Sequence, residues 1–295
     1  MIIIGENIHV IAKDVSVAIR ERDAKVIQGL AREQTGAKAD YIDLNVGPMK
    51  KDTEETMKWL VSCVQDVTDL PLSIDTMNPV AMEAGLKFCK KRPLINSASG
   101  KTDSKAQMLP LAKKYNCEVV ISVMTDKGMP PEIESKIDSI METVSHANEL
   151  GIPNEDIWVD PIILPVSTAG EGQNIALGNL EFIKILQDVL PGVKSTVGLS
   201  NISNGVPAHL RPILNRTYLV MLGRNGLYSA IADPLDEELM AFMKGKLPAI
   251  TDLIYRTLDG EEIDLSPLPQ KEAAYVKTAR VLMAQSLYSD AWLEI

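Results

Sequence analysis

The sequence predicts an α/β fold, a single (β/α)8 TIM barrel with extra C-terminal helices, and three observations support this. Short apolar segments rich in β-branched residues alternate with segments of helical period from the first residues onward. We count eight such strands, each followed by a helix, and eight parallel strands with crossover helices close into a barrel. The chain of 295 residues is 45% hydrophobic, which is ample for one large core.

The predicted strands are short and apolar. In chain order they are Ile2–Ile4, Tyr41–Asn45, Leu72–Asp75, Leu94–Asn96, Val119–Val123, Trp158–Asp160, Ser195–Leu199 and Ser229–Ala232. A doubly wound open sheet is the alternative. The first strand leads into Gly5-Glu6-Asn7 and not into a glycine-rich dinucleotide fingerprint, which disfavours that alternative.

The predicted helices lie between these strands and carry apolar residues every three or four positions. Gly36, Gly151 and Gly226 stand where helices are expected to end. The predicted helices are Ala24–Gln34, one beginning near Thr53, Pro79–Cys89, Lys105–Tyr115, Glu132–Leu150, Gly178–Leu190 and about Leu210–Asn225.

The C-terminal part is predicted to be helical beyond the last strand. It comprises a helix over Leu235–Lys244, a helical face made by Leu247, Ile250, Ile254 and Leu258, a loop over Glu261–Gln270 and a final amphipathic helix over Ala273–Trp292. We therefore expect a barrel at residues 1–240 and a helical extension at residues 241–295 packed on it. The segment 243–271 is interpreted as packing or, alternatively, as a docking or dimer surface.

Composition narrows the possible partners and locations. A net charge of −10 argues against nucleic-acid binding, which needs a basic surface. No apolar run approaches the ~18 residues that span a bilayer, and the first six residues lack the basic region of a signal peptide. We expect a cytoplasmic protein. Cys63, Cys89 and Cys117 form no CxxC pair, so a zinc knuckle or redox dithiol is not expected.

Polar side chains follow the ends of successive predicted strands, and in a barrel these ends meet at one mouth. Carboxylates and carboxamides there can hydrogen-bond a flat, nitrogen-rich ligand. Each one alone could instead cap the next helix. The set comprises Glu6, Asn7, Asn45, Asp75, Asn96, Met124, Asp160, Asn201 and Asp233.

Other chemistries fit this set less well. Paired carboxylates could cleave glycosidic bonds, but sugar platforms need aromatic residues, which make up only 4% of the chain. Carboxylates could also hold Mg²⁺, but we expect no metal site. No Ser/His/Asp or Cys/His set can be built from His9, His146 and His209. None of these histidines lies in Asp-x-His-x-x-Gly, a corrinoid-ligating pattern, so the chain should not ligate a corrinoid through its own histidine.

Eight stretches of the chain carry a resemblance to a known family. They are Ile3-Ile4-Gly5-Glu6, Asp43-Leu44-Asn45-Val46-Gly47-Pro48, Asp75-Thr76-Met77-Asn78, Ile95-Asn96-Ser97, Asp160-Pro161-Ile162-Ile163-Leu164-Pro165, Gly198-Leu199-Ser200-Asn201, Asn215-Arg216-Thr217 and Ala230-Ile231-Ala232-Asp233. In this order they resemble the methyltetrahydrofolate:corrinoid-protein methyltransferases, which are pterin-binding TIM barrels. The resemblance is closest to the acetogen-type enzymes.

The resemblance implies a methyl transfer between N5 of methyltetrahydrofolate and the cobalt of a corrinoid (cobalamin) on a separate protein. Cobalt(I) is then the nucleophile, so the barrel needs none. Asn201 would donate a hydrogen bond to N5 as the C–N bond breaks, while Asp75, Asn96 and Asp160 would hold the pterin ring. Further expected pterin-site residues are Gly198, Ser200, Glu6, Asp43 and Arg211. Gly198 and Ser200 would allow a close approach, and Arg211 would steady the glutamate tail of the folate or the Asn201 loop.

Two alternatives and several open points accompany this interpretation. A dihydropteroate synthase needs a cationic pyrophosphate site, but Ala230–Asp233 carries neither Arg nor His. A non-catalytic pterin-binding subunit is the second alternative. The loop after Asn201 is longer than the family pattern, with Asn204 where glutamine is expected. The corrinoid protein, the direction and the pterin (folate or methanopterin) stay open, and a homodimer is expected.

Overall fold

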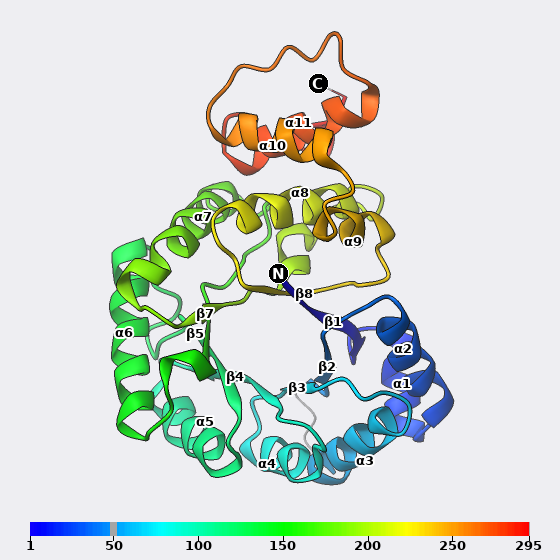
Figure 1. The fold of residues 1–295 in the computed structure, drawn as a ribbon, viewed down its shortest axis with the longest axis vertical. Coiled ribbons are helices and arrows are strands. Elements are labelled where there is room, and N and C mark those ends of the chain that lie inside the picture. Colours follow the sequence, from blue (N-terminus) through cyan, green and yellow to red (C-terminus); the bar gives the residue numbers. More distant parts are fainter. Residues whose placement is uncertain (48–51, 295) are drawn as a thin grey trace.

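The computed structural model describes residues 1–47 and 52–294, and these form a barrel of parallel strands ringed by helices (Figure 1). The strands are hydrogen-bonded in the order β7-β6-β5-β4-β3-β2-β1-β8. The predicted fold class is therefore confirmed. Pro48, the last residue of one family motif, lies outside the described residues.

The strands are short and nearly all apolar, as predicted. Their bounds are β1 Ile2–His9, β2 Tyr41–Asn45, β3 Leu72–Asp75, β4 Leu94–Ser99, β5 Glu118–Ser122, β6 Ile157–Asp160, β7 Lys194–Ser195 and β8 Ser229–Ala232. The barrel closes between β7 and β8. There Ile231 N donates to Val197 O at 2.8 Å, and Gly198 forms a single bridge to Ile231.

The helices cover the outside of the barrel. They are α1 Lys13–Glu21, α2 Ala24–Gly36, α3 Thr53–Gln65, α4 Pro79–Phe88, α5 Thr102–Tyr115, α6 Ile133–Glu149, α7 Gly172–Val189, α8 Arg211–Arg224, α9 Glu237–Met243, α10 Pro248–Leu258 and α11 Gln270–Leu282. Short 3-10 helices occupy Asn154–Asp156 and Leu199–Ser203. The helices α10 and α11 pack against each other and against α8 (Figure 1).

A small apolar cluster fills the barrel interior. It joins Ile4, Leu94, Val120 and Trp158 from four strands and is separate from the large core between strands and helices. At the N-terminal ends of the strands the carboxylate of Glu118 accepts hydrogen bonds from three groups. These are Tyr41 Oη at 2.9 Å, Trp158 Nε1 at 3.2 Å and Lys194 Nζ at 2.6 Å. Polar and charged groups close the base of the barrel.

Several elements differ in extent from the prediction, such as β1, which continues to His9, and α7, which begins at Gly172 and not at Gly178, and one helix was not predicted. The helix α1 was not predicted, because Ala12 at its N-terminus offers no capping side chain, although Val15, Ala18 and Ile19 form its buried face. The predicted strand Ser195–Leu199 ends at Ser195, and Leu199 begins a 3-10 helix. The final helix ends at Leu282 and not at Trp292.

The last helix ends early because of the backbone conformation that follows it. Ala284 is in the left-handed region with φ +55°, which turns the chain away from the helix axis. Trp292 then folds back and donates from Nε1 to Thr278 Oγ1 at 3.0 Å.

Among the described residues, no helix combines the length and the apolar character needed to span a membrane.

Candidate active site

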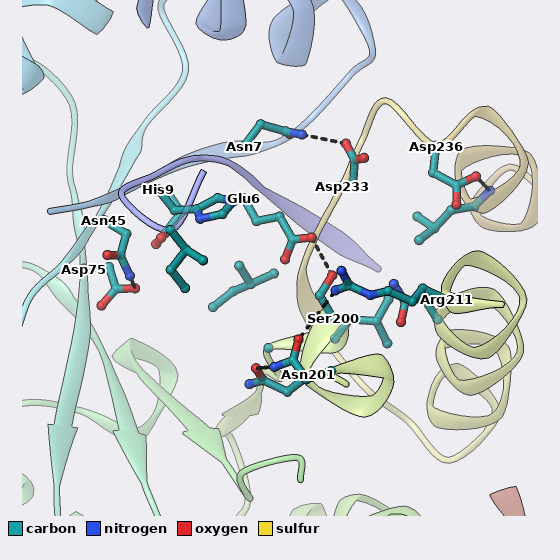
Figure 2. A pocket seen from close by; sticks show the side chains of 18 of the residues that line it. Glu6, Asn7, His9, Asn45, Asp75, Ser200, Asn201, Arg211, Asp233 and Asp236 are labelled. Carbon is teal, nitrogen blue, oxygen red and sulfur yellow. Dashed lines mark hydrogen bonds between the residues drawn. The ribbon is translucent and has the colours of Figure 1, made fainter. Parts of the chain in front are cut away.

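The predicted site residues meet in one cavity at the C-terminal ends of the strands. The cavity has a volume of about 700 Å³. All nine residues predicted for catalysis or pterin binding line it: Glu6, Asp43, Asp75, Asn96, Asp160, Gly198, Ser200, Asn201 and Arg211. Of the other strand-end residues, Asn7, Asn45 and Asp233 also line the cavity, whereas Met124 does not (Figure 2).

Carboxylates and carboxamides stand level across β2, β3 and β4. The parallel register pairs Asn45 with Asp75 and Asp75 with Asn96. The Asn45 Nδ2 donates to the Asp75 carboxylate (Figure 2). Two residues before Asn45 on β2, Asp43 accepts from Ser73 Oγ and from Asn96 Nδ2 at 3.2 Å. These bonds fix the four cavity side chains Asn45, Asp75, Asp43 and Asn96 before any ligand binds.

The opposite wall of the cavity combines β1, β8 and the Asn201 loop. Ser200 Oγ donates to Glu6, and Asn7 Nδ2 donates to Asp233 Oδ1 at 2.9 Å (Figure 2). The oxygen of the Asn7 amide is buried without a hydrogen-bond partner among the described residues. It is therefore an acceptor that a ligand can satisfy.

Burial raises the pKa of four carboxyl groups in the cavity. Burial raises the pKa of Glu6 to about 7, although the hydrogen bond from Ser200 opposes this. Burial also raises the pKa of Asp43 and of Asp160 to about 6 each. The pKa of Asp75 lies well above its ordinary value because of burial and the nearby Asp43. Near neutral pH these groups can therefore either accept or supply a proton.

These raised pKa values predict that stability falls as the pH rises. Each carboxyl binds its proton more tightly in the folded protein than in the unfolded chain, where its pKa is near 4. The stabilisation is thus complete below about pH 4 and is lost as the pH rises through the folded values of about 6 to 7. We expect thermal unfolding to occur several degrees higher at pH 6 than at pH 8, at ~1 kcal/mol for each carboxyl.

Calorimetry at several pH values measures this slope. Asp43→Asn, which keeps an acceptor oxygen for Ser73, should make the slope shallower, whereas substitution of the exposed Asp103 by asparagine should leave it unchanged. A melting temperature that is flat or rises from pH 6 to pH 8 would show that the mouth carboxyls are not held in this way.

Asp160 is held by the backbone that follows it. Its Oδ1 accepts from the Ile162 N–H at 2.8 Å. Ile162 has φ +61°, a left-handed conformation that a β-branched residue rarely adopts. The carboxylate therefore keeps one orientation, with its other oxygen available to the cavity.

Asn201 lies on the 3-10 helix that follows β7, and not at a strand end as predicted. Its Oδ1 accepts from Asn204 Nδ2 at 3.1 Å, which leaves the Asn201 amide nitrogen available to donate. A side chain at Gly198 would place its Cβ 3.0 Å from that nitrogen, so glycine leaves the Asn201 amide room that a side chain would reduce. Arg211 donates to Ser203 Oγ at 3.2 Å and so contacts the Asn201 loop (Figure 2).

The geometry limits the chemistry of the site. Among the described residues there is no group of three or more His, Cys, Asp or Glu side chains that could hold a metal ion. Acceptors predominate on the β2–β6 side, and one exposed carboxamide donor stands beside them at Asn201. Such a mouth suits a planar ligand rich in N–H groups whose reacting nitrogen faces the amide of Asn201.

Some lining residues had no assigned role in the sequence. Asn215 and Asp236 are two of them, and the amide oxygen of Asn215 is buried without a partner among the described residues. Asn215 belongs to one of the eight matching stretches, which was the available signal. Arg216 beside it does not face the ligand space but pairs with Asp236 and Glu238.

Comparison with known proteins places these features in a family. The family model described as pterin binding enzyme matches residues 15–231. A methylcorrinoid:tetrahydrofolate methyltransferase from Eubacterium limosum is 32% identical over 243 residues, which are 81% of this chain and 88% of that protein. Methionine synthase from Mycobacterium tuberculosis is 26% identical over 78% of this chain, but the chain spans only 20% of that longer protein.

Solved structures show the same fold. A dihydropteroate synthase from Xanthomonas albilineans in complex with 7,8-dihydropteroate has a TM-score of 0.59 at 15% identity, covering 83% of this chain and 92% of that one. The dihydropteroate synthase from Thermus thermophilus has a TM-score of 0.58 at 19% identity, with coverage of 83% and 93%. At such low identity the likeness concerns the fold alone.

Proposed function

Since the chain belongs to the pterin-binding enzymes, and within them to the corrinoid:folate methyltransferases, we propose that it transfers a methyl group between N5 of methyltetrahydrofolate and the cobalt of a corrinoid on a separate protein. The observation that carries this proposal is the single cavity in which the acceptors of β2, β3, β4 and β6 face the amide of Asn201.

The acceptor side of the mouth would hold the pterin. Asp75 and Asp160 each offer carboxylate oxygens to ring N–H groups, and Asn96 offers both a donor and an acceptor. Because Asn45 and the Ile162 N–H already fix the two carboxylates, the ring would be held in one orientation. Glu6, Asp43, Gly198 and Ser200 would complete the wall.

Asn201 would act at the reacting nitrogen. When the C–N bond breaks, its electron pair stays on N5 and the methyl carbon bonds to cobalt, whose own electron pair makes the new bond. N5 then takes up a proton. A hydrogen bond from the Asn201 amide stabilises the charge that develops on N5. The name of the Eubacterium limosum relative describes the reverse direction, from methylcorrinoid to tetrahydrofolate. In that direction the same amide would orient N5 for attack.

Arg211 would support this amide and not the glutamate tail of the folate. Of the two roles expected from the sequence, its hydrogen bonds to Ser203 and Asn204 favour the loop.

The homodimer, the cytoplasmic location and the division of the chain at residue 240 stay predictions. The corrinoid protein would approach from the open end of the cavity, which Asn201 lines.

The function is tested by mixing the protein with methyltetrahydrofolate and reduced free cobalamin while recording the cobalt spectrum. We expect the cob(I)alamin bands to decay as methylcobalamin forms, at a rate proportional to protein concentration, with no change when folate is omitted. Folded protein that binds methyltetrahydrofolate but transfers no methyl group to free or protein-bound corrinoid would instead be a pterin-binding subunit. Dihydropteroate synthase activity is not proposed, because Ser229–Ala232 of β8 carries no cation for pyrophosphate.

A further inference from the structure

Lys136 is a buried lysine that the proposed reaction does not use. It lies on α6 within the apolar face that contains Ile137 and Ile140, and its side chain is only 4% exposed. Its Nζ donates to the backbone oxygen of Pro161 at 3.1 Å and to Asn179 Oδ1 at 3.0 Å. A buried ammonium is costly, so such a position demands partners of this kind.

Asn179 extends the contact to the next residue of the chain. It lies on α7, is fully buried, and its Nδ2 donates to the backbone oxygen of Ile162 at 3.0 Å. Lys136 and Asn179, the clamp, therefore hold the carbonyl groups of the two residues that directly follow Asp160. The clamp lies behind the loop, on the side away from the cavity.

The clamped segment is the strained one. A left-handed conformation is strained for a β-branched residue, so Ile162 keeps φ +61° only if its surroundings enforce it. That conformation brings the Ile162 N–H to Asp160 Oδ1. The clamp thus controls the orientation of the Asp160 carboxylate through two backbone carbonyls.

The clamp also acts on Asp160 by its charge. The Lys136 ammonium opposes the effect of burial on the pKa of Asp160, and burial lowers the pKa of Lys136 to about 8. The other ionisable groups that line the cavity are Glu6, Asp43, Asp75, Asp233, Asp236, His9 and Arg211, but Lys136 is the charged group whose field lowers the pKa of Asp160. Lys136 is thus the cation that faces Asp160 from α6, and both groups are charged between about pH 6 and pH 8.

We propose that Lys136 and Asn179 are positioning residues that aim the Asp160 carboxylate at the pterin ring and keep it negatively charged at neutral pH. This rests on the proposed function for the identity of the ligand. A purely structural role for the same residues would stabilise the barrel without affecting how ligand binding depends on pH.

The test is the affinity for methyltetrahydrofolate between pH 5.5 and pH 9, for wild-type protein, Lys136→Met and Lys136→Arg. In the methionine variant the lower limb of the profile should move up by about one to two pH units, with a several-fold loss at pH 6.5 that disappears near pH 9. Lys136→Arg keeps the charge and should retain the wild-type limb. Lys114→Met, which removes an exposed lysine of α5, is the matched control.

Asn179→Leu separates orientation from charge. It removes the donor to Ile162 O as well as one of the two acceptors of the Lys136 ammonium, so the affinity should fall even near pH 9, where the effect of Lys136→Met disappears. A Lys136→Met loss that is equal at every pH, or is absent, would overturn the role of the charge, and wild-type affinity in Asn179→Leu would overturn the role of orientation.

One readout requires no folate. The pKa of the Asp160 carboxyl, followed by ¹³C NMR of the free protein, should be higher in Lys136→Met than in wild type and unchanged in Lys114→Met. Its failure to move would overturn the clamp even if methyl transfer is observed. Wild-type protein that forms no methylcobalamin would overturn the proposed function and leave this pKa difference standing.

Discussion

Replacing Asn201 with alanine is expected to lower the methyl-transfer rate by a factor of about 10²–10³, while affinity for methyltetrahydrofolate falls no more than a few-fold. The physical reason is that different residues of the cavity would bind the pterin ring and act on N5. The pterin ring would be held by Asp75, Asn96 and Asp160, which do not contact Asn201, whereas the Asn201 amide would act mainly on the charge that develops on N5.

Single-turnover kinetics with reduced cobalamin separate the two effects, because binding and transfer are then measured in one experiment. Asn204→Ala is the matched control, since the Asn204 side chain donates to the oxygen of the Asn201 amide at 3.1 Å and accepts from Arg211, but is given no role at N5. It should reduce the rate far less than Asn201→Ala. Equal losses of rate and affinity in Asn201→Ala would assign Asn201 to ligand binding and remove it from the step at N5.

Replacing Glu118 with alanine is expected to lower the free energy of unfolding by about 3–5 kcal/mol. The carboxylate of Glu118 is 7% exposed and accepts from Tyr41, Trp158 and Lys194. Its removal leaves an ammonium, an indole N–H and a phenol at the base of the barrel without their acceptor. The loss exceeds that of a surface ion pair because these donors cannot all reach water.

Urea unfolding measures this loss, with Glu142→Ala as the control. Glu142 pairs with Lys105 at 2.6 Å but its side chain is 74% exposed, so its removal should cost less than about 1 kcal/mol. The folate affinity of the folded Glu118→Ala protein should be unchanged, because the base lies at the opposite end of the barrel from the cavity. A loss no larger than that of Glu142→Ala would mean that solvent reaches the Glu118 group freely.

The regular part of the barrel was predictable because its periodicity reflects burial on two faces. The bounds of β2, β3 and β8 agree with the prediction to the residue. The seam between β7 and β8 was not predictable, because Thr196–Leu199 is as apolar and β-branched as a strand. The chain leaves the sheet there and forms the 3-10 helix that carries Asn201. This change depends on tertiary contacts, which the local sequence does not indicate.

The site was predictable where its residues sit at strand ends, since the fold gathers such positions. The network between them was not predictable, because hydrogen bonds such as Asn45 to Asp75 depend on register across strands. Lys136 was missed although a signal existed: a lysine on the same helical face as Ile137 and Ile140 interrupts an otherwise apolar stripe.

The linked side chains of β2, β3 and β4 have a consequence for how this family diversifies. Asp43, Asn45, Asp75 and Asn96 bond to one another directly or share a register level, so a mutation of one leaves another without its partner. Lineages should therefore change these positions together or not at all. The Asn201 loop is held by separate bonds, such as Ser200 to Glu6 and Arg211 to Ser203, so single substitutions there can be inherited separately.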